Sequence, residues 1–274
     1  MEYHYLISGL PDLKQANAKT APAQDTLLEE LQNTLAPADL ALLAVLRMRY
    51  DNANLLSYLA DKDAKLNPLG NLSAADWQEL ITLMDELDVP KDNRLQPYVL
   101  EFYRMLNDEK AAAEMVSKED FLATLYYDFG TGSKNTFLAE WFSFCLNLNN
   151  ILTATICRKH GFDVKQAVIG NNEVAQALRT SSARDFGLSG LLSDADKMMA
   201  LAEEQNLLER EKKIDALKWA WLEEHTFFHF FGVEHVLAYW LQCELLHRWD
   251  GLTVEQGKEI FKNVLNDLKK DVKF

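Results

Sequence analysis

Apolar residues recur every three or four positions along most of the chain, which is the spacing of one buried helix face. All six prolines lie at or before Pro97, so nothing in the later sequence interrupts long helices. The pattern predicts an all-α protein of about ten helices. The clearest runs are Leu27, Leu28, Leu31 and Leu35; Leu42, Leu43, Leu46, Tyr50, Leu55, Leu56 and Leu59; Leu80, Leu83, Met84 and Leu87; and Tyr98, Phe102, Met105 and Leu106.

Several positions mark where these helices begin and end. Ser73 with Asp76, and Thr253 with Gln256, have the spacing of capping boxes at helix starts. Residues 194–231 predict one long helix or two joined end to end. Residues 233–249 are apolar enough to lie mostly inside the protein. Residues 3–8 alone favour an extended segment, because they begin with aromatic residues and end at a glycine-proline turn.

Two of the predicted helices share a polar step followed by a glycine-containing break. Asp51 and Asn54 precede aliphatic residues and a Gly-Asn turn, and Asn147 and Asn150 do the same. A looser third copy contains Glu244 and Arg248. Buried amides must be hydrogen-bonded, so we expect these residues to tie helices to neighbouring helices or loops. Chance similarity in a leucine-rich chain is the alternative.

If the repeat is real, helical units stack on a shared core, as in other repeat proteins. We then expect a single all-α domain over residues 1–274, made of units at about residues 1–110, 111–190 and 191–274. The helix pairs around Asn54 and Asn150 should superpose, with both asparagines buried.

The repeated polar steps resemble those of the C/d-type subunits of rotary V/A-type ATPases, a family found in bacterial, archaeal and eukaryotic enzymes. Residues 51–55 are similar to the D-x-x-N-L step of that family, residues 144–158 to its second copy, and Glu244 with Arg248 to its C-terminal step. The tyrosine-bearing start at residues 3–6 is also similar. The sequence departs from the family where Asn147 replaces a residue that is usually charged, and where the third copy lacks an asparagine.

The resemblance implies a non-catalytic adaptor, in a diverged bacterial relative, that links the central shaft of the ATPase to the membrane rotor ring. The shaft subunits and the ring would be its partners. It would lie in the cytoplasm, peripheral to the inner membrane and associated with it only through the complex. Its contact surfaces should carry aromatic residues near loops, and the candidates are Tyr126, Tyr127, Phe129 and Trp249. The alternative is that these rings fold back onto the helix bundle.

Composition narrows the classes of partner. The chain has 28 Lys and Arg against 42 Asp and Glu, a formal net charge of −14. This charge disfavours nucleic acid and direct binding to anionic lipid. The first ten residues lack the features of a signal peptide, and the longest uncharged stretch, residues 141–157, contains three asparagines that favour a buried helix over a membrane span. Cys145, Cys157 and Cys243 lack metal or redox spacing, which suggests a reducing cytoplasm.

Late histidines raise the alternative of an enzyme. His225, His229, His235 and His247 have glutamates nearby in the sequence, and Glu244 with His247 forms one E-x-x-H motif. A di-iron carboxylate bundle needs two such motifs, and residues 225–229 lack the glutamate of an H-E-x-x-H metalloprotease. We therefore predict no catalytic residues, no metal and no cofactor. A metal- or small-molecule-binding helical-bundle enzyme, and a helical scaffold for an unrelated partner, stay as alternatives.

Residues 130–134 read Gly-Thr-Gly-Ser-Lys, which superficially suggests a phosphate-binding loop. The G-x-x-x-x-G-K-[ST] spacing is absent, and no predicted strand precedes the segment. We expect a turn there instead, with Thr131 or Ser133 capping the helix that follows.

Overall fold

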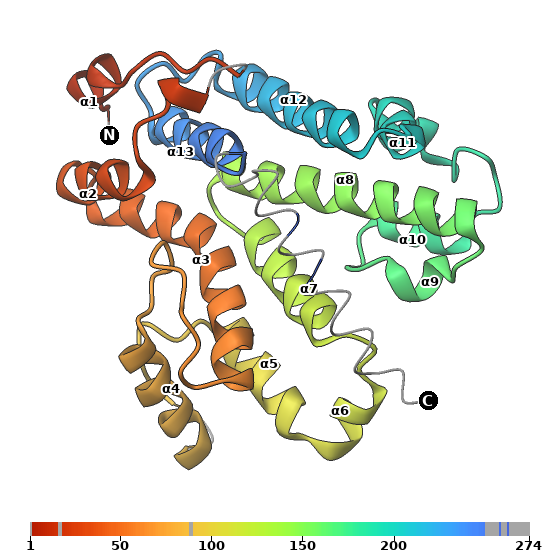
Figure 1. Cartoon of the computed structure of the whole chain (residues 1–274), viewed down its shortest axis with the longest axis horizontal. Coiled ribbons are helices and arrows are strands. Elements are labelled where there is room, and N and C mark those ends of the chain that lie inside the picture. Colours follow the sequence, from red (N-terminus) through yellow and green to blue (C-terminus); the bar gives the residue numbers. More distant parts are fainter. Residues whose placement is uncertain (1, 16–17, 88–89, 250–257, 259–261, 263–274) are drawn as a thin grey trace. The chain divides into compact units, whose positions relative to one another are not determined.

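A computed structural model of the protein describes residues 2–15, 18–87, 90–249, 258 and 262. These residues contain thirteen α-helices, two short 3₁₀-helices and no β-strand, so the predicted all-α class is confirmed (Figure 1). In chain order the elements are α1 (His4–Gly9), η1 (Ala18–Thr20), α2 (Gln24–Thr34), α3 (Pro37–Ala60), α4 (Ala74–Glu86), α5 (Pro97–Asn107), α6 (Glu109–Glu114), α7 (Lys118–Thr131), α8 (Thr136–His160), α9 (Val164–Ala167), α10 (Glu173–Thr180), η2 (Leu188–Gly190), α11 (Ala195–Glu203), α12 (Leu207–Thr226) and α13 (Val233–His247).

The chain divides into two compact units. Unit 1 combines the two ends of the chain, Met1–Asp39 and Ile214–Phe274, and unit 2 is Leu40–Lys213. Unit 1 therefore contains α1, η1, α2, most of α12 and α13. Unit 2 contains most of α3 and the helices from α4 to α11. The three repeat-based units stay a prediction, because a division by contacts does not test a division by repeats.

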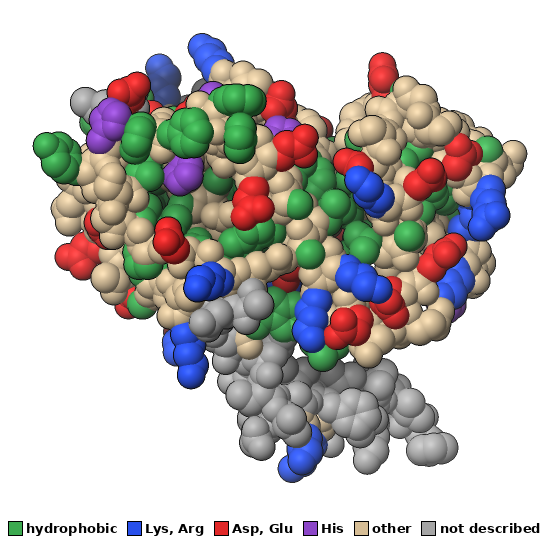
Figure 2. Space-filling view, turned by 90° about the horizontal axis from the view of Figure 1, so that it is seen from above, with side chains coloured by type: hydrophobic (Ala, Val, Ile, Leu, Met, Phe, Trp, Pro, Cys, Tyr) green, Lys and Arg blue, Asp and Glu red, His purple; other side chains and the backbone are tan. Residues whose placement is uncertain are grey.

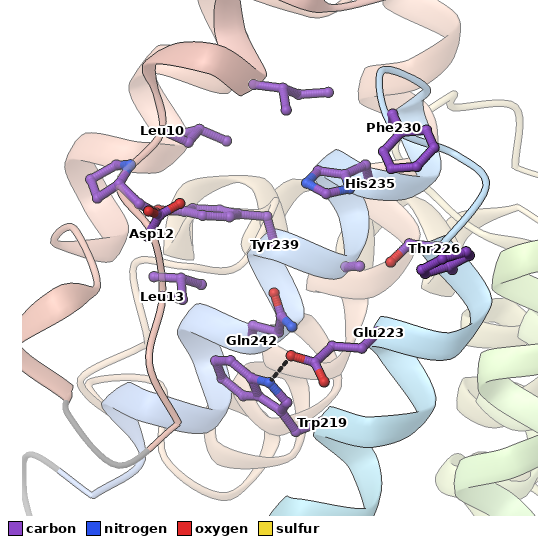
Figure 3. Close-up of a pocket in the computed structure, with 14 residues that line it drawn as sticks. Leu10, Asp12, Leu13, Trp219, Glu223, Thr226, Phe230, His235, Tyr239 and Gln242 are labelled. Carbon is purple, nitrogen blue, oxygen red and sulfur yellow. Dashed lines mark hydrogen bonds between the residues drawn. The ribbon is translucent and has the colours of Figure 1, made fainter.

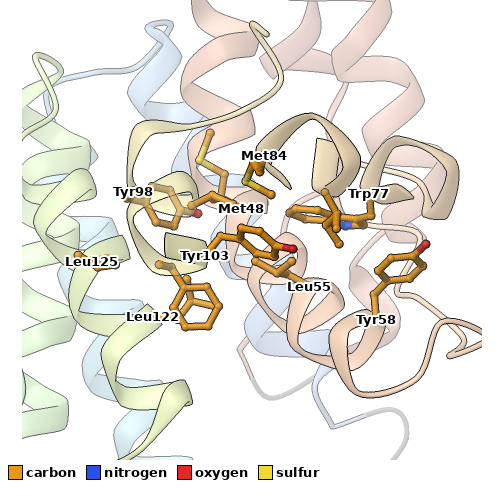
Figure 4. Close-up of a cluster of buried hydrophobic side chains, with 12 residues drawn as sticks. Met48, Leu55, Tyr58, Trp77, Met84, Tyr98, Tyr103, Leu122 and Leu125 are labelled. Carbon is orange, nitrogen blue, oxygen red and sulfur yellow. The ribbon is translucent and has the colours of Figure 1, made fainter. Parts of the chain in front are cut away.

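Unit 2 has a hydrophobic core shared by α3, α4, α5 and α7 (Figure 4). Helix α8 packs against α7, α9, α10 and α11. Burial of large apolar side chains is the main favourable term in such a core. The buried cluster consists of Met48, Leu55, Tyr58, Trp77, Ile81, Met84, Tyr98, Val99, Phe102, Tyr103, Leu122 and Leu125.

Two predicted helix starts have different outcomes. The capping box of Ser73 and Asp76 is confirmed at the start of α4, where each side chain accepts a hydrogen bond from the backbone N–H of the other residue. The predicted cap of α8 is wrong. Gly130 and Thr131 belong to α7, and Asn135 caps α8 by accepting from the N–H of Leu138. Asn135 stands three residues before Leu138, which is the N-cap geometry.

The prediction of an extended segment at residues 3–8 is also wrong. The chain forms helix α1 there, and the hydroxyl of Tyr3 bonds to the Asp39 carboxylate and accepts from the N–H of Ala36. The N–H of Tyr3 donates to the carbonyl of Phe231, 2.7 Å away. These long-range contacts within unit 1 fix the segment, so local aromatic preference does not decide its conformation.

The C-terminal helices follow the sequence pattern more closely. Residues 194–231 form two helices, α11 and α12, separated by residues 204–206. Most residues of α13 are buried, as predicted. The predicted start at Thr253 and the turn at Gly251 lie outside the described residues. In the part of the chain that the structure describes, no helix combines the length and hydropathy needed to cross a membrane.

Candidate functional site

A buried polar clamp ties α3 to the turn that follows it. Asn54 pairs with both backbone groups of Asn67: its Oδ1 accepts from the Asn67 N–H (2.7 Å), and its Nδ2 donates to the Asn67 carbonyl (3.0 Å). One helical turn earlier, the Asp51 carboxylate accepts from the N–H groups of Asn71 (2.7 Å) and Leu72 (3.0 Å) and from the Asn71 amide (2.6 Å). The two side chains therefore satisfy the backbone of a loop that would otherwise bury unpaired groups.

Two further residues complete this clamp. Arg47, which is buried, donates from Nε to the carbonyl of Leu69 (2.9 Å) and from Nη2 to that of Gly70 (2.7 Å). A Cβ at Gly70 would lie 2.7 Å from Asp51 Oδ1 and 2.8 Å from Asn54 Nδ2, so the turn requires glycine here. Sequence reasoning missed Arg47, although it stands four residues before Asp51, on the same helix face.

The charges of this clamp are held in a poorly solvated place. Burial raises the pKa of Asp51, and hydrogen bonds from Asn71 and Leu72 together with the Arg47 charge oppose that rise. Burial also lowers the pKa of Arg47, and the Asp51 charge opposes that change. Each charge thus offsets part of the desolvation cost of the other.

A second clamp ties α8 to the segment before α10. Asn150 pairs with both backbone groups of Ile169, accepting from its N–H (3.0 Å) and donating to its carbonyl (2.8 Å). Asn147 accepts from the side-chain amide of Asn172 (2.8 Å), which caps α10 through the N–H of Ala175. Asn54 and Asn150 thus make the same two-bond contact and are 3% and 1% exposed. Superposition of the two helix pairs stays a prediction.

We predict that Asn150→Leu lowers the free energy of unfolding by about 1–3 kcal/mol, because both backbone groups of Ile169 lose their partner. Urea unfolding followed by far-UV circular dichroism measures this loss. Asn33→Leu, at an exposed position of α2, is the control and should stay within about 0.5 kcal/mol of the wild type. An unchanged midpoint in Asn150→Leu would remove the argument for a clamp.

The third polar step bonds to a neighbouring helix instead of a turn. Arg248 donates from Nη1 to Asp215 Oδ1 (2.6 Å), and Trp249 donates from Nε1 to Asp215 Oδ2 (2.8 Å). Glu244 is buried and accepts from the indole of Trp240 (3.0 Å). Burial raises the pKa of Asp215, and the Arg248 charge opposes that rise. Asp215, on α12, was missed because only the tertiary structure brings it to residues 248 and 249.

The predicted contact aromatics of α7 lie in the helix itself and not in a loop. Tyr126 donates its hydroxyl hydrogen to the carbonyl of Val45 (2.9 Å), and its ring meets the Phe142 ring edge-on at 5.0 Å between centroids. Phe129 packs beside Tyr98, with centroids 5.3 Å apart. Both side chains are only partly exposed. Their position in a loop is therefore a wrong prediction.

The other two predicted contact residues also bond within the protein. Tyr127 accepts from the Asn149 amide (2.8 Å), and Trp249 is held by Asp215. These contacts favour the alternative in which the four rings pack on the bundle. A role in partner binding stays a prediction for all four residues.

The late histidines have separate neighbours. No group of three or more His, Cys, Asp or Glu among the described residues is placed to hold a metal ion. His225 stacks on Trp221, His229 lies 3.9 Å from the carboxylate of Glu234, His247 bonds the carbonyl of Pro22, and His235 lines a pocket described below.

Metal analysis of the purified protein separates the adaptor from the enzyme alternative. We predict no stoichiometric metal at His225, His229, His235 or His247, because their neighbours do not converge on one point. Zinc or iron that survives dialysis and is lost in His229→Ala would favour the enzyme.

A different aromatic surface is exposed in unit 1. The connection between α12 and α13, residues 227–231, carries four phenylalanines around His229, and we call it the phenylalanine loop. Phe227, Phe228 and Phe230 are 62%, 84% and 60% exposed. Hydrophobic side chains and histidines gather at this end of unit 1 (Figure 2). Exposed aromatic clusters of this kind mark interaction sites. Sequence reasoning had treated these rings as neighbours of core histidines.

A pocket of about 290 Å³ lies beside the phenylalanine loop, within unit 1 (Figure 3). Its wall from α12 includes Trp219, whose indole donates to Glu223 Oε1 (2.7 Å). Helix α13 contributes Tyr239, which donates to the carbonyl of Pro11 (3.0 Å). The lining is Ile7, Leu10, Pro11, Asp12, Leu13, Trp219, Glu223, Thr226, Phe227, Phe230, His235, Ala238, Tyr239 and Gln242.

Comparison with known proteins gives one match. No curated protein and no solved structure matches the chain. A family model described as "Protein of unknown function (DUF2764)" matches residues 1–272, which is nearly the whole length. The chain therefore belongs to the DUF2764 family of proteins of unknown function.

Proposed function

We propose that the protein is a non-catalytic adaptor of a rotary V/A-type ATPase, which links the central shaft to the membrane rotor ring. The observation that carries the proposal is the pair of buried clamps on α3 and α8. Asp51 with Asn54, and Asn147 with Asn150, are the steps in which the sequence resembles the C/d-type family. In each pair the asparagine holds both backbone groups of one residue.

A mechanical role asks for stiffness more than for reactive groups. An adaptor that transmits torque must not yield between its helices. Buried hydrogen bonds that are fully satisfied resist such yielding, because separating them leaves polar groups unpaired in a poorly solvated interior. The clamps fix the connections after the two longest helices of unit 2. This supports a body that acts by holding its partners.

The charge of the protein fits an indirect place at the membrane. A net charge of −14 opposes direct binding to anionic lipid and to nucleic acid. The adaptor would therefore lie in the cytoplasm and reach the inner membrane through its partners, the shaft subunits and the rotor ring.

Co-expression with the shaft and ring subunits of the same organism's rotary ATPase tests the proposal. We expect the tagged protein to co-purify with both, and membranes that lack it to hydrolyse ATP without pumping ions. Adding the purified wild-type protein should restore pumping, whereas bovine serum albumin, an acidic protein, should not. Failure to bind either partner, or normal pumping without the protein, would overturn the proposal.

A further inference from the structure

We infer that the pocket beside the phenylalanine loop receives a lysine or arginine side chain from an apolar segment of a partner protein. The inference uses only the surface of unit 1 and stands apart from the rotary ATPase proposal. It rests on the charge of the pocket, on its aromatic walls and on the exposed rings around its mouth.

The charged groups of the pocket favour a cation. Asp12 and Glu223 line it, and its lining contains no lysine or arginine. The remaining titratable groups there are Tyr239 and His235. Burial lowers the pKa of His235, so its imidazole is neutral near pH 7 and adds no positive charge. An ammonium or guanidinium group would meet two carboxylates and no competing cation.

The walls suit the rest of a long basic side chain. Trp219, Phe227, Phe230 and Tyr239 supply aromatic surface for its methylene groups and for a cation–π contact. Figure 3 shows these walls coming from α12, α13 and the segment around Asp12. A volume of about 290 Å³ is at the lower end of ligand pockets, which span roughly 300–1,000 Å³. One side chain is therefore a better fit than a cofactor.

The surroundings require an apolar partner and exclude two other occupants. Phe228 stands outside the pocket and is the most exposed ring of the loop, so the segment that carries the cation must cover it with apolar groups. The sequence has no lysine or arginine between Lys218 and Arg248. A second copy of this surface would thus bring no cation of its own, and an anionic membrane would face acidic side chains.

A peptide probe tests the inference on the full-length protein. The probe is a fluorescein-labelled helical peptide with leucine on one face and lysine on the other, and its control has glutamine at every lysine position. By fluorescence anisotropy we expect the lysine peptide to bind at least about tenfold more tightly than the glutamine peptide. Glu223→Gln and Asp12→Asn should each weaken the lysine peptide by about threefold or more, and Phe228→Ser should weaken both peptides.

Glu224→Gln is the matched control, because Glu224 is exposed on the same helix but does not line the pocket. It removes the same charge and should change binding by less than about twofold. An equal loss in Glu224→Gln and Glu223→Gln would show general charge attraction and overturn the inference. No binding of the lysine peptide would do the same. So would wild-type dimers, or binding to phosphatidylcholine–phosphatidylglycerol vesicles, that Phe228→Ser abolishes.

Discussion

Replacing Asp51 with alanine should lower the free energy of unfolding by about 3–5 kcal/mol, the range for removing one partner of a buried charged pair. The carboxylate accepts three hydrogen bonds, from the backbone of Asn71 and Leu72 and from the Asn71 side chain. Its loss leaves these donors unpaired and leaves the buried Arg47 guanidinium without a nearby negative charge. Urea unfolding followed by far-UV circular dichroism provides the measurement.

Two variants give this result its meaning. Asp51→Asn keeps an acceptor oxygen and the side-chain volume but loses the charge, so its loss of stability should lie between those of the wild type and Asp51→Ala. Glu101→Ala removes an exposed carboxylate from α5 and should change stability by less than about 0.5 kcal/mol. If Asp51→Ala were as stable as Glu101→Ala, the clamp would hold nothing.

Replacing Gly130 with alanine should also destabilise the protein, by about 1–3 kcal/mol or more. Gly130 is buried in α7, and a Cβ there would overlap the ring of Phe142 on α8, 2.5 Å from Cε1 and closer still to Cγ and Cδ1. Alanine in an open helix would instead stabilise by roughly 0.5–1 kcal/mol, so the clash must exceed that gain. Thermal unfolding of the purified variant measures the net effect.

The ring that causes the clash can be changed as a check. Phe142→Leu removes part of the ring, so the double variant Gly130→Ala/Phe142→Leu should lose less stability than the two single losses together. Gly190→Ala is the control, since no atom lies within 4 Å of its added Cβ. A Gly130→Ala protein that melts like the wild type would contradict the close approach of α7 and α8.

Features that depend on neighbouring residues were predictable from the sequence. The three-to-four residue spacing of apolar positions gives the all-α class, and the apolar composition of residues 233–249 gives a buried α13. The capping box of Ser73 and Asp76 depends on residues three apart and is found as predicted. The buried, hydrogen-bonded state of Asn54 and Asn150 was predictable too, since an amide within an apolar helix face needs a partner.

Long-range contacts decided the features that local pattern did not predict. Residues 4–9 are helical in a unit where Tyr3 bonds to Asp39 and Phe231, and neither partner is close in sequence. Asp215 finds its partners at Arg248 and Trp249 in the same way.

Aromatic exposure was decided at the same level. Tyr126 and Phe129 are covered because α7 packs on α5 and α8, whereas Phe228 is left uncovered in the connection from α12 to α13. Hydrophobicity and spacing are alike in the two groups of rings. Which rings become core and which stay at the surface depends on the packing of helices that are distant in the chain, and local pattern carries no information about that packing.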